Sequence, residues 1–243
     1  MIKHGIGVNS NMRKRMRIQF HKLLSLPKTL FFNFYYFPFA QAIKFPLIVS
    51  YSCIVKNLGK RGSVKLSQVS RGIVQIGIHD GSFSMGNEKS CFWDIQENAQ
   101  LEFQGKCLIS RGCRITVCKN AKLTFGEDFY ANSGFIVSAA KDIRFGDDCL
   151  LGWNCCVIDG DGHQIVSTED ETILNSPKSV VIGNHVWLSS NSTVLKGSSI
   201  ESGSIVAAHA CVSSRFNEKN VLVGGLPAKV MKRNVTWNHQ IPN

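Results

Sequence analysis

The sequence predicts a mainly β chain in which short strands stack into a parallel solenoid. A large aliphatic residue recurs at every sixth position in the C-terminal third, and the residue four positions after each is mostly small. A period of six is a multiple of the two-residue period of extended chain but not of the 3.6-residue helical period, so only strands keep these residues on one face. The composition, 44% hydrophobic and 19% charged, excludes collagenous and wholly disordered classes.

Residues 1–59 are predicted to form a basic, aromatic N-terminal segment. From Met1 to His79 the chain carries 13 Lys or Arg and no Asp or Glu, whereas the remainder has a balance of −2. From Met12 to Pro46 these bases are interleaved with Leu, Phe and Tyr. This mixture suits an anionic membrane surface, and it suits a cap over the core of the next domain equally well. We expect no nucleic-acid partner, because no nucleic-acid motif accompanies the aromatic residues.

Several features of the chain favour a cytoplasmic location. The longest apolar run, Leu30 to Ala40, is interrupted by Asn33 and Pro38 and is shorter than the roughly 18 residues that a membrane span needs. The first residues lack an apolar core followed by a cleavage site, so no secretory signal is predicted. The nine cysteines contain no CxxC pair, which favours small core residues in a reducing compartment.

The solenoid is predicted over residues 60–233, irregular at first and followed by a tail at 234–243. Its clearest aliphatic positions are Ile182, Leu188, Val194, Ile200, Val206 and Val212. The small positions are Val186, Ser192, Ser198, Ser204 and Ala210. The register also returns upstream at Phe145, Leu151 and Val157, and at Phe125, Ala131 and Val137. Three hexads would close a triangular coil of about 18 residues, with parallel strands about 4.8 Å apart. Glycines after core positions are expected in turns of positive φ: Gly126, Gly146 and Gly183.

The hexads IGNHVW, LSSNST, VLKGSS, IESGSI and VAAHAC, with the closing GGLPAKVMKR, resemble the hexapeptide-repeat acyltransferases. Within that superfamily the chain is most similar to sugar O-acetyltransferases that modify bacterial surface polysaccharides. The resemblance covers residues 60–233 and is strongest from Phe145 onward. It implies a left-handed parallel β-helix; the periodicity alone does not choose the hand.

The resemblance implies acetyl-CoA-dependent transfer of an acetyl group to a sugar hydroxyl of a surface glycan or its precursor, including a nucleotide-sugar acceptor. It also implies a homotrimer with the donor in the groove between subunits. Two alternatives remain open: an N-acetyltransferase for an amino sugar, and a non-catalytic β-helix scaffold. Nucleotidyl transfer is disfavoured because residues 1–60 contain no Gly-rich nucleotide loop.

One long excursion, at about 159–180, interrupts the repeat and begins near His163. Acyl transfer from a thioester to an alcohol needs a base that takes the hydroxyl proton and returns it to the departing thiolate, and histidine suits both steps. In the resembled family the catalytic histidine occupies this place. Its second ring nitrogen needs an orienting acceptor, for which Asp161 is the chosen candidate and Asp159 and Glu169 are alternatives.

Donor and acceptor contacts follow from the resemblance by position. The predicted donor contacts are the small corner residues Ser190, Ala208 and Ser213, and the bases Lys229 and Lys232, with Arg233 as a possible helper. The acceptor-side candidates are Asn132, Trp153 and Trp187. The chain departs from the family pattern at Ser189 and at Gly225-Leu226, which leaves the donor contacts less defined.

No metal site is predicted. A zinc-dependent carbonic anhydrase of similar fold needs three histidines converging from adjacent coils. Neither the step from His163 to His185 nor the step from His185 to His209 equals the length of three hexads, so these side chains do not stack on successive coils. His185 and His209 are therefore interpreted as turn or surface residues.

Overall fold

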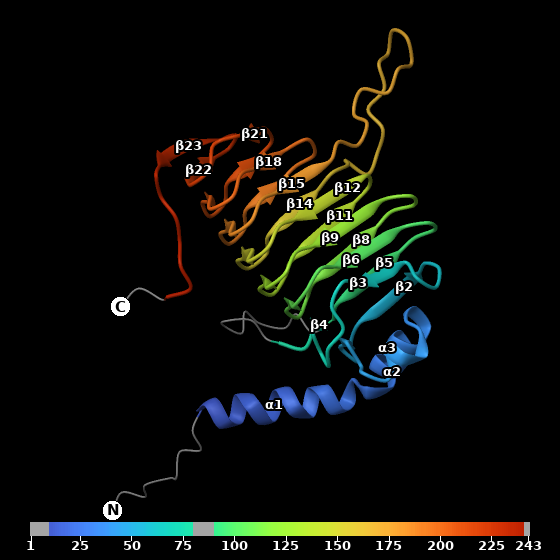
Figure 1. Cartoon of the computed structure of the whole chain (residues 1–243). Helices are drawn as coiled ribbons and strands as arrows, with labels where there is room; N and C mark the ends of the chain where they lie inside the picture. Colours follow the sequence, from blue (N-terminus) through green and yellow to red (C-terminus); the bar gives the residue numbers. More distant parts are fainter. Residues whose placement is uncertain (1–9, 80–89, 241–243) are drawn as a thin grey trace, which may run out of the picture.

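Three parallel sheets wind around a shared core (Figure 1). The computed structural model describes residues 10–79 and 90–240. The start of the predicted N-terminal segment, residues 1–9, and the end of the predicted tail, residues 241–243, lie outside the described residues. Every third strand joins the same sheet, so each coil visits all three sheets once. The predicted β-helix fold class is confirmed.

The strands are short and their bounds follow the coils. Sheet I comprises β1 (Leu47–Val49), β4 (Val74–Ile76), β7 (Cys107–Ile109), β10 (Phe129–Ala131), β13 (Leu150–Leu151), β16 (Trp187–Leu188), β19 (Ile205–Val206), β22 (Val221–Gly225) and β23 (Ala228–Arg233). Sheet II comprises β2 (Ile54–Leu58), β5 (Phe92–Ile95), β8 (Arg114–Val117), β11 (Ile136–Ala139), β14 (Cys156–Ile158), β17 (Thr193–Val194) and β20 (Cys211–Val212). Sheet III comprises β3 (Val64–Leu66), β6 (Gln100–Phe103), β9 (Lys122–Phe125), β12 (Asp142–Phe145), β15 (Val180–Ile182), β18 (Ser199–Ile200) and β21 (Arg215–Phe216).

The repeat positions fill the core. The six aliphatic residues of the C-terminal hexads are each at most 2% exposed, and the five small residues four positions later are at most 1% exposed. In sheet III the rings of Phe103, Phe125 and Phe145 stack on one another, with centroids 5.4 and 5.3 Å apart. The inward positions of the hexads are thus those that the sequence predicts.

Coil length varies along the solenoid. Leu188 pairs with Val206, three hexads further along the chain, as the repeat predicts. Ile109 pairs with Ala131 in the same sheet across a step longer than three hexads, so that earlier coil is longer. The strands also start before residue 60, since β1 and β2 already pair with β4 and β5. Because these coils lack six-residue spacing, the sequence pattern predicts a later start.

Three glycines where sheet III turns into sheet I are needed for close packing. Gly126, Gly146 and Gly183 have no positive φ, so that expectation is wrong. A Cβ on Gly126 would lie 2.3 Å from the Gly146 backbone, and one on Gly146 would lie 2.7 Å from the Gly183 backbone. Positive φ occurs two residues after Gly146, at Asp148, where φ is 53°.

Two helices, α1 (Ser10–Leu24) and α2 (Leu26–Tyr36), cap the open edge of β1, and the short α3 (Phe39–Ala42) follows. The capping side chains recur at every fourth position and are at most 6% exposed: His21, Ser25, Thr29 and Asn33. Asn33 Nδ2 donates to the Leu47 carbonyl at 2.7 Å, and Asn33 Oδ1 accepts from the Leu47 amide at 3.2 Å. Thr29 Oγ1 accepts from the Val49 amide at 3.3 Å, and Ser25 Oγ accepts from the Tyr51 amide at 3.0 Å.

The helix and strand spacings match. Four helical residues rise about 6.0 Å and two strand residues rise about 6.6 Å, so every fourth helical side chain meets every second strand residue. Behind this ladder, Phe32 packs against Trp93 with ring centroids 5.3 Å apart, and Trp93 Nε1 donates to Tyr36 Oη. These contacts support the capping interpretation for the inner face of the N-terminal segment.

The nine cysteines are free thiols, and six of them are buried. Burial raises the pKa of Cys149 to about 12 and that of Cys155 to about 11, so both remain protonated. These residues are therefore small core side chains. None of the described helices combines the length and the apolarity that crossing a bilayer requires.

Candidate functional site

The head of the long excursion between β14 and β15 is fixed by a buried carboxylate. Asp159 is 0% exposed and accepts hydrogen bonds from three successive backbone amides, those of Ala140, Lys141 and Asp142. Burial raises the pKa of Asp159, while the three amide donors act in the opposite direction. Its own carbonyl accepts from the Lys178 amide at 3.0 Å, so Asp159 ties both ends of the excursion together.

The neck of the excursion is held by Asn175, which is 9% exposed. Its Nδ2 donates to the His163 carbonyl and to Asp161 Oδ2, both at 2.8 Å, and its Oδ1 accepts from the Ile165 amide at 2.7 Å. Asp161 also pairs with Lys196 of the next coil. The hydrogen bonds from Lys196 and Asn175 lower the pKa of Asp161. Beyond this neck the chain forms a hairpin with a bridge between Val166 and Ile173, which projects from the solenoid in Figure 1.

His163 lies at the base of this hairpin with an exposed side chain. Within the described part of the chain, its imidazole makes no hydrogen bond with Asp159, Asp161 or Glu169. Asp159 is committed to backbone amides, Asp161 to Lys196 and Asn175, and Glu169 lies in the distal turn. The backbone of His163 is thus fixed, and its exposed ring is accessible to a second molecule.

Four of the predicted ligand residues share one edge of the prism. The turns from sheet I to sheet II are here called the I–II corner. Trp153, Ser190 and Ala208 occupy equivalent positions there on successive coils, and the buried Asn132 lies one residue earlier in the register on the coil before Trp153. Asn132 Nδ2 donates to the Leu151 carbonyl at 3.0 Å, and the Trp153 amide donates to Ser190 Oγ at 3.3 Å. Ala208 is exposed, and Trp153 and Ser190 are half-buried. The corner therefore presents small side chains and one indole along a continuous edge.

His163 belongs to a different edge. The excursion leaves at the turns from sheet II to sheet III, the II–III corner, where Ser213 also lies, exposed, just after β20. One side of the prism, from Asn154 to Gly160, is six residues long, which is about 20 Å of extended chain. Within one chain, the predicted base and the I–II corner are therefore on separate edges.

Trp187 lies on a third face, in β16. It borders a groove of about 1100 Å³ between sheet I and the C-terminal tail. The tail residue Trp237 packs 6.4 Å from the Trp187 ring and stacks on His185 at 4.3 Å. Trp187 is thus separate from Trp153 and Asn132 within the chain.

His185 closes a polar clamp on the tail. Its Nδ1 lies 2.6 Å from Asp148 Oδ2, its Nε2 lies 3.0 Å from the Trp237 carbonyl, and His239 Nε2 reaches Asp148 Oδ1 at 2.9 Å. Partial burial raises the pKa of Asp148, but the hydrogen bonds from both histidines outweigh it, and the net pKa lies below the usual range. His185 and His209 both have positive φ, 53° and 59°, as corner residues do.

The predicted phosphate-binding bases lie in β23, which pairs antiparallel with β22 at the end of sheet I. Lys229 and Lys232 are exposed. Arg233 is engaged instead by Glu218, through contacts of 2.7 and 3.1 Å. Over the described ranges, 10–79 and 90–240, no group of three His, Cys, Asp or Glu side chains is arranged to hold a metal ion.

Sequence reasoning missed Asn175, Lys196 and Trp237. Asn175 lies in the excursion, where no register assigns a position. The six-residue register could have identified Lys196. Val157 and Val194 are both core positions and pair with each other, so Lys196 lies beside Asp159, two residues further along each strand. Trp237 lies after the last hexad, so only the folded tail brings it to His185.

The chain is similar to bacterial acetyltransferases. No protein-family model matches it. It is 33% identical over 135 residues to a polysialic acid O-acetyltransferase of Neisseria meningitidis, covering 56% of this chain and 60% of that protein. It is 25% identical over 154 residues to the putative lipopolysaccharide biosynthesis O-acetyl transferase WbbJ of Escherichia coli K12, covering 60% of this chain and 76% of that protein.

A solved structure, that of the polysialic-acid-specific acetyltransferase NeuO, aligns with a TM-score of 0.49 and 22% identity, over 80% of this chain and 84% of that one. The chain spans 60% of the length of the Neisseria relative. The two sequence relatives confirm the resemblance to surface-polysaccharide O-acetyltransferases that the hexads indicate.

Proposed function

We propose that this protein is an acetyl-CoA-dependent O-acetyltransferase that acts on a sugar hydroxyl of a bacterial surface glycan or its precursor. The observation that carries the proposal is the placement of His163, an exposed imidazole on a backbone fixed by Asn175 and Asp159, at the base of the excursion between β14 and β15. The sequence relatives named as polysaccharide O-acetyltransferases support the transferred acetyl group and the acceptor class.

In the proposed reaction, His163 accepts the proton of the sugar hydroxyl as the oxygen attacks the thioester carbonyl. A backbone amide stabilises the tetrahedral oxyanion. When the carbon–sulfur bond breaks, the imidazolium returns the proton to the thiolate of CoA, so protons and electrons balance and the enzyme is regenerated. Asn175 and Asp161 are positioning residues in this scheme, because they hold the His163 backbone rather than the ring.

The active unit is a homotrimer in this proposal, with each site built from two chains. His163 lies at the II–III corner, and the small-residue edge lies at the I–II corner of the same chain, one full side of the prism away. An acetyl group can contact both only if the I–II corner comes from a neighbouring subunit. Closed rotational symmetry would supply such a corner to every His163.

The donor is placed along the shared groove. Ser190 and Ala208 present small side chains beside closely spaced backbone, since a Cβ on Gly152 would lie 2.5 Å from the Ser190 amide nitrogen. Such an edge suits a thin pantetheine chain that approaches the backbone. Ser213 lies on the histidine side of the groove, and Lys229 and Lys232 are exposed cations for the nucleotide phosphates. Trp153, Asn132 and Trp187 are the proposed acceptor contacts. This donor and the nine free thiols favour the cytoplasm.

The function is tested with purified full-length protein, acetyl-CoA and fractionated glycans, nucleotide sugars and amino sugars. Release of the CoA thiol should depend on a hydroxyl acceptor, and the acetyl group should leave the product on treatment with alkaline hydroxylamine, as an ester does. A hydroxylamine-stable product would identify an amide and favour N-acetyl transfer. Absence of thiol release with every acceptor would favour the scaffold alternative.

A further inference from the structure

The outward face of the N-terminal helices is apolar, the reverse of the usual surface helix. The inner ladder of His21, Ser25, Thr29 and Asn33 is polar and buried. On α1, Met16, Phe20 and Leu23 are 64, 62 and 60% exposed. These residues follow a spacing of four and three, which places them on the side of the helix opposite His21 and Ser25.

The same stripe continues along α2. Leu30 and Phe34 are each 42% exposed and keep the spacing of three and four through Pro27. We call the stripe formed by these side chains the outward apolar face: Met16, Phe20, Leu23, Pro27, Leu30 and Phe34. A contiguous exposed stripe of large apolar residues marks an interaction surface rather than an ordinary solvent face.

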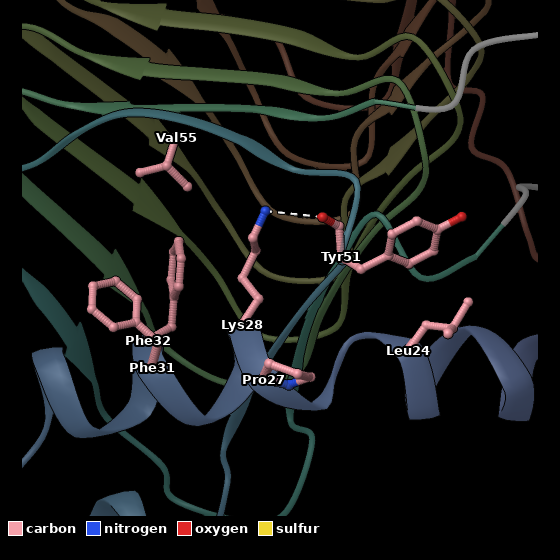
Figure 2. A pocket seen from close by; sticks show the side chains of 7 residues that line it. All are labelled: Leu24, Pro27, Lys28, Phe31, Phe32, Tyr51 and Val55. Atoms are coloured by element: carbon pink, nitrogen blue, oxygen red, sulfur yellow. Dashed lines mark hydrogen bonds between the residues drawn. The ribbon is translucent and has the colours of Figure 1, made fainter.

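The stripe borders a hollow, with which it shares Pro27. Figure 2 shows this hollow of about 470 Å³ between α2 and β2, lined among others by Phe31, Tyr51 and Val55. Lys28 reaches across it and donates to the carbonyls of Tyr51, at 2.9 Å, and Cys53. Lys28 therefore fastens α2 to the solenoid. Leu30 and Phe34 on the same helix remain exposed to solvent.

Charge identifies the partner of the outward apolar face. No acidic residue occurs from Met1 to His79, whereas the sequence of α1 alone contains Arg13, Lys14, Arg15, Arg17 and Lys22. Among the side chains of these bases that the structure describes, Lys22 falls beside the stripe in a helical projection. A second copy of this face would bring like charges together without an acidic partner, which disfavours a helix-to-helix seam.

We infer that the outward apolar face docks on an anionic bilayer, with its apolar side chains at the boundary between headgroups and acyl chains, and that the basic, acid-free N-terminal sequence attracts it to the lipid phosphates. An amphipathic helix with an apolar, aromatic face and basic flanks is the form that lies in a membrane interface. Each base near such a surface contributes an attraction that salt screens.

The geometry leaves the catalytic excursion in water. In Figure 1, α1 runs across the N-terminal end of the coil stack. The coil that carries His163 lies four sheet-I strands further along, from β1 through β4, β7 and β10 to β13. At about 4.8 Å per step, this is roughly 20 Å from the docked end. Membrane docking and acetyl transfer are therefore separable in experiment.

The test is co-sedimentation of the full-length protein with vesicles of phosphatidylcholine alone or with about 30% phosphatidylglycerol. The protein should bind the anionic vesicles at low salt and dissociate as salt rises to about 0.5 M. Phe20→Glu should weaken binding at least about tenfold, because it removes an apolar anchor and adds a negative charge. The fold should survive, since the Phe20 side chain is 62% exposed.

The matched control is Leu226→Glu, which likewise replaces an exposed apolar side chain with a carboxylate, at a position that is 80% exposed in the turn between β22 and β23. It should bind the anionic vesicles like the unaltered protein. The inference is overturned if the unaltered protein does not bind at low salt, or if Phe20→Glu and Leu226→Glu bind alike. It is also overturned if Phe20→Glu reduces the oligomer mass in sedimentation velocity, because the face would then contact a second copy.

Discussion

Asp159 and Asn175 explain how a long surface excursion can present one side chain reproducibly. Asp159 binds three amides of the preceding coil, and Asn175 binds both arms of the neck. The position of His163 was predictable, because a break in a six-residue repeat is visible in the sequence. The role of Asn175 was not, because its partners lie 10 to 14 residues away in a segment without periodicity.

Replacement of Asp159 tests the head of the excursion. Asp159→Asn should lower the free energy of unfolding by about 1–3 kcal/mol, because its amide nitrogen is a donor and would face the amide donors of Ala140, Lys141 and Asp142 at a fully buried side chain. Urea unfolding measures this change. Asp128→Asn is the control, since its carboxylate is 54% exposed and pairs with the exposed Lys106; we expect a loss below about 1 kcal/mol. Equal losses in both variants would contradict the role of Asp159.

The six-residue pattern predicts the C-terminal coils well, but it does not predict the earlier coils or the role of the N-terminal helices. The C-terminal hexads were readable because each occupies the same six-residue length, whereas the earlier coils carry extra corner residues. The N-terminal cap was predicted only as one of two interpretations. The sequence alone does not show that the polar residues at every fourth position are buried, because a polar stripe on an isolated helix indicates a solvent face. Their role becomes clear only from the position of β1 beside the helix.

The ladder predicts that replacing a buried polar residue with an apolar one destabilises the protein, because the polar side chain satisfies backbone groups of β1. Asn33→Leu should destabilise the fold by about 1–3 kcal/mol, because it leaves the buried amide and carbonyl of Leu47 without partners. Thermal or urea unfolding measures this. Phe34→Leu, at the adjacent and 42% exposed position, should change stability by less than about 0.5 kcal/mol. A stabilised Asn33→Leu variant would show that the ladder does not hold the edge of β1.

At the scale of the whole molecule, two edges and one face of the prism carry different functional candidates. His163 lies on one edge, Ser190 and Ala208 on another, and Trp187 beside the tail on the third face. The sequence could place these residues on hexads, but it could not say which edges meet, because that depends on contacts between subunits. In a site built from two chains, His163 of one subunit would lie beside the I–II corner of its neighbour.

Complementation between subunits tests this arrangement. His163→Ala lacks the proposed base, and Ala208→Trp fills the proposed donor edge, so each homotrimer should be inactive. Co-expression should produce mixed trimers in which roughly a quarter of the sites pair an intact histidine with an intact corner, by random assortment. Light scattering should give a mass near three times 26.9 kDa. Activity no greater than the sum of the separate variants would contradict a shared site.

The most direct test of the central claim is the turnover of the His163→Ala variant, followed by release of the CoA thiol with the acceptor that supports acetylation. The account predicts a fall of roughly 10² to 10⁴ in turnover, with donor affinity and the thermal unfolding profile unchanged. His239→Ala is the matched control, because it removes a 65% exposed imidazole from the tail, away from the excursion, and turnover should remain near that of the unaltered protein. Near-normal turnover in the His163→Ala variant would contradict the assignment of His163 as the general base.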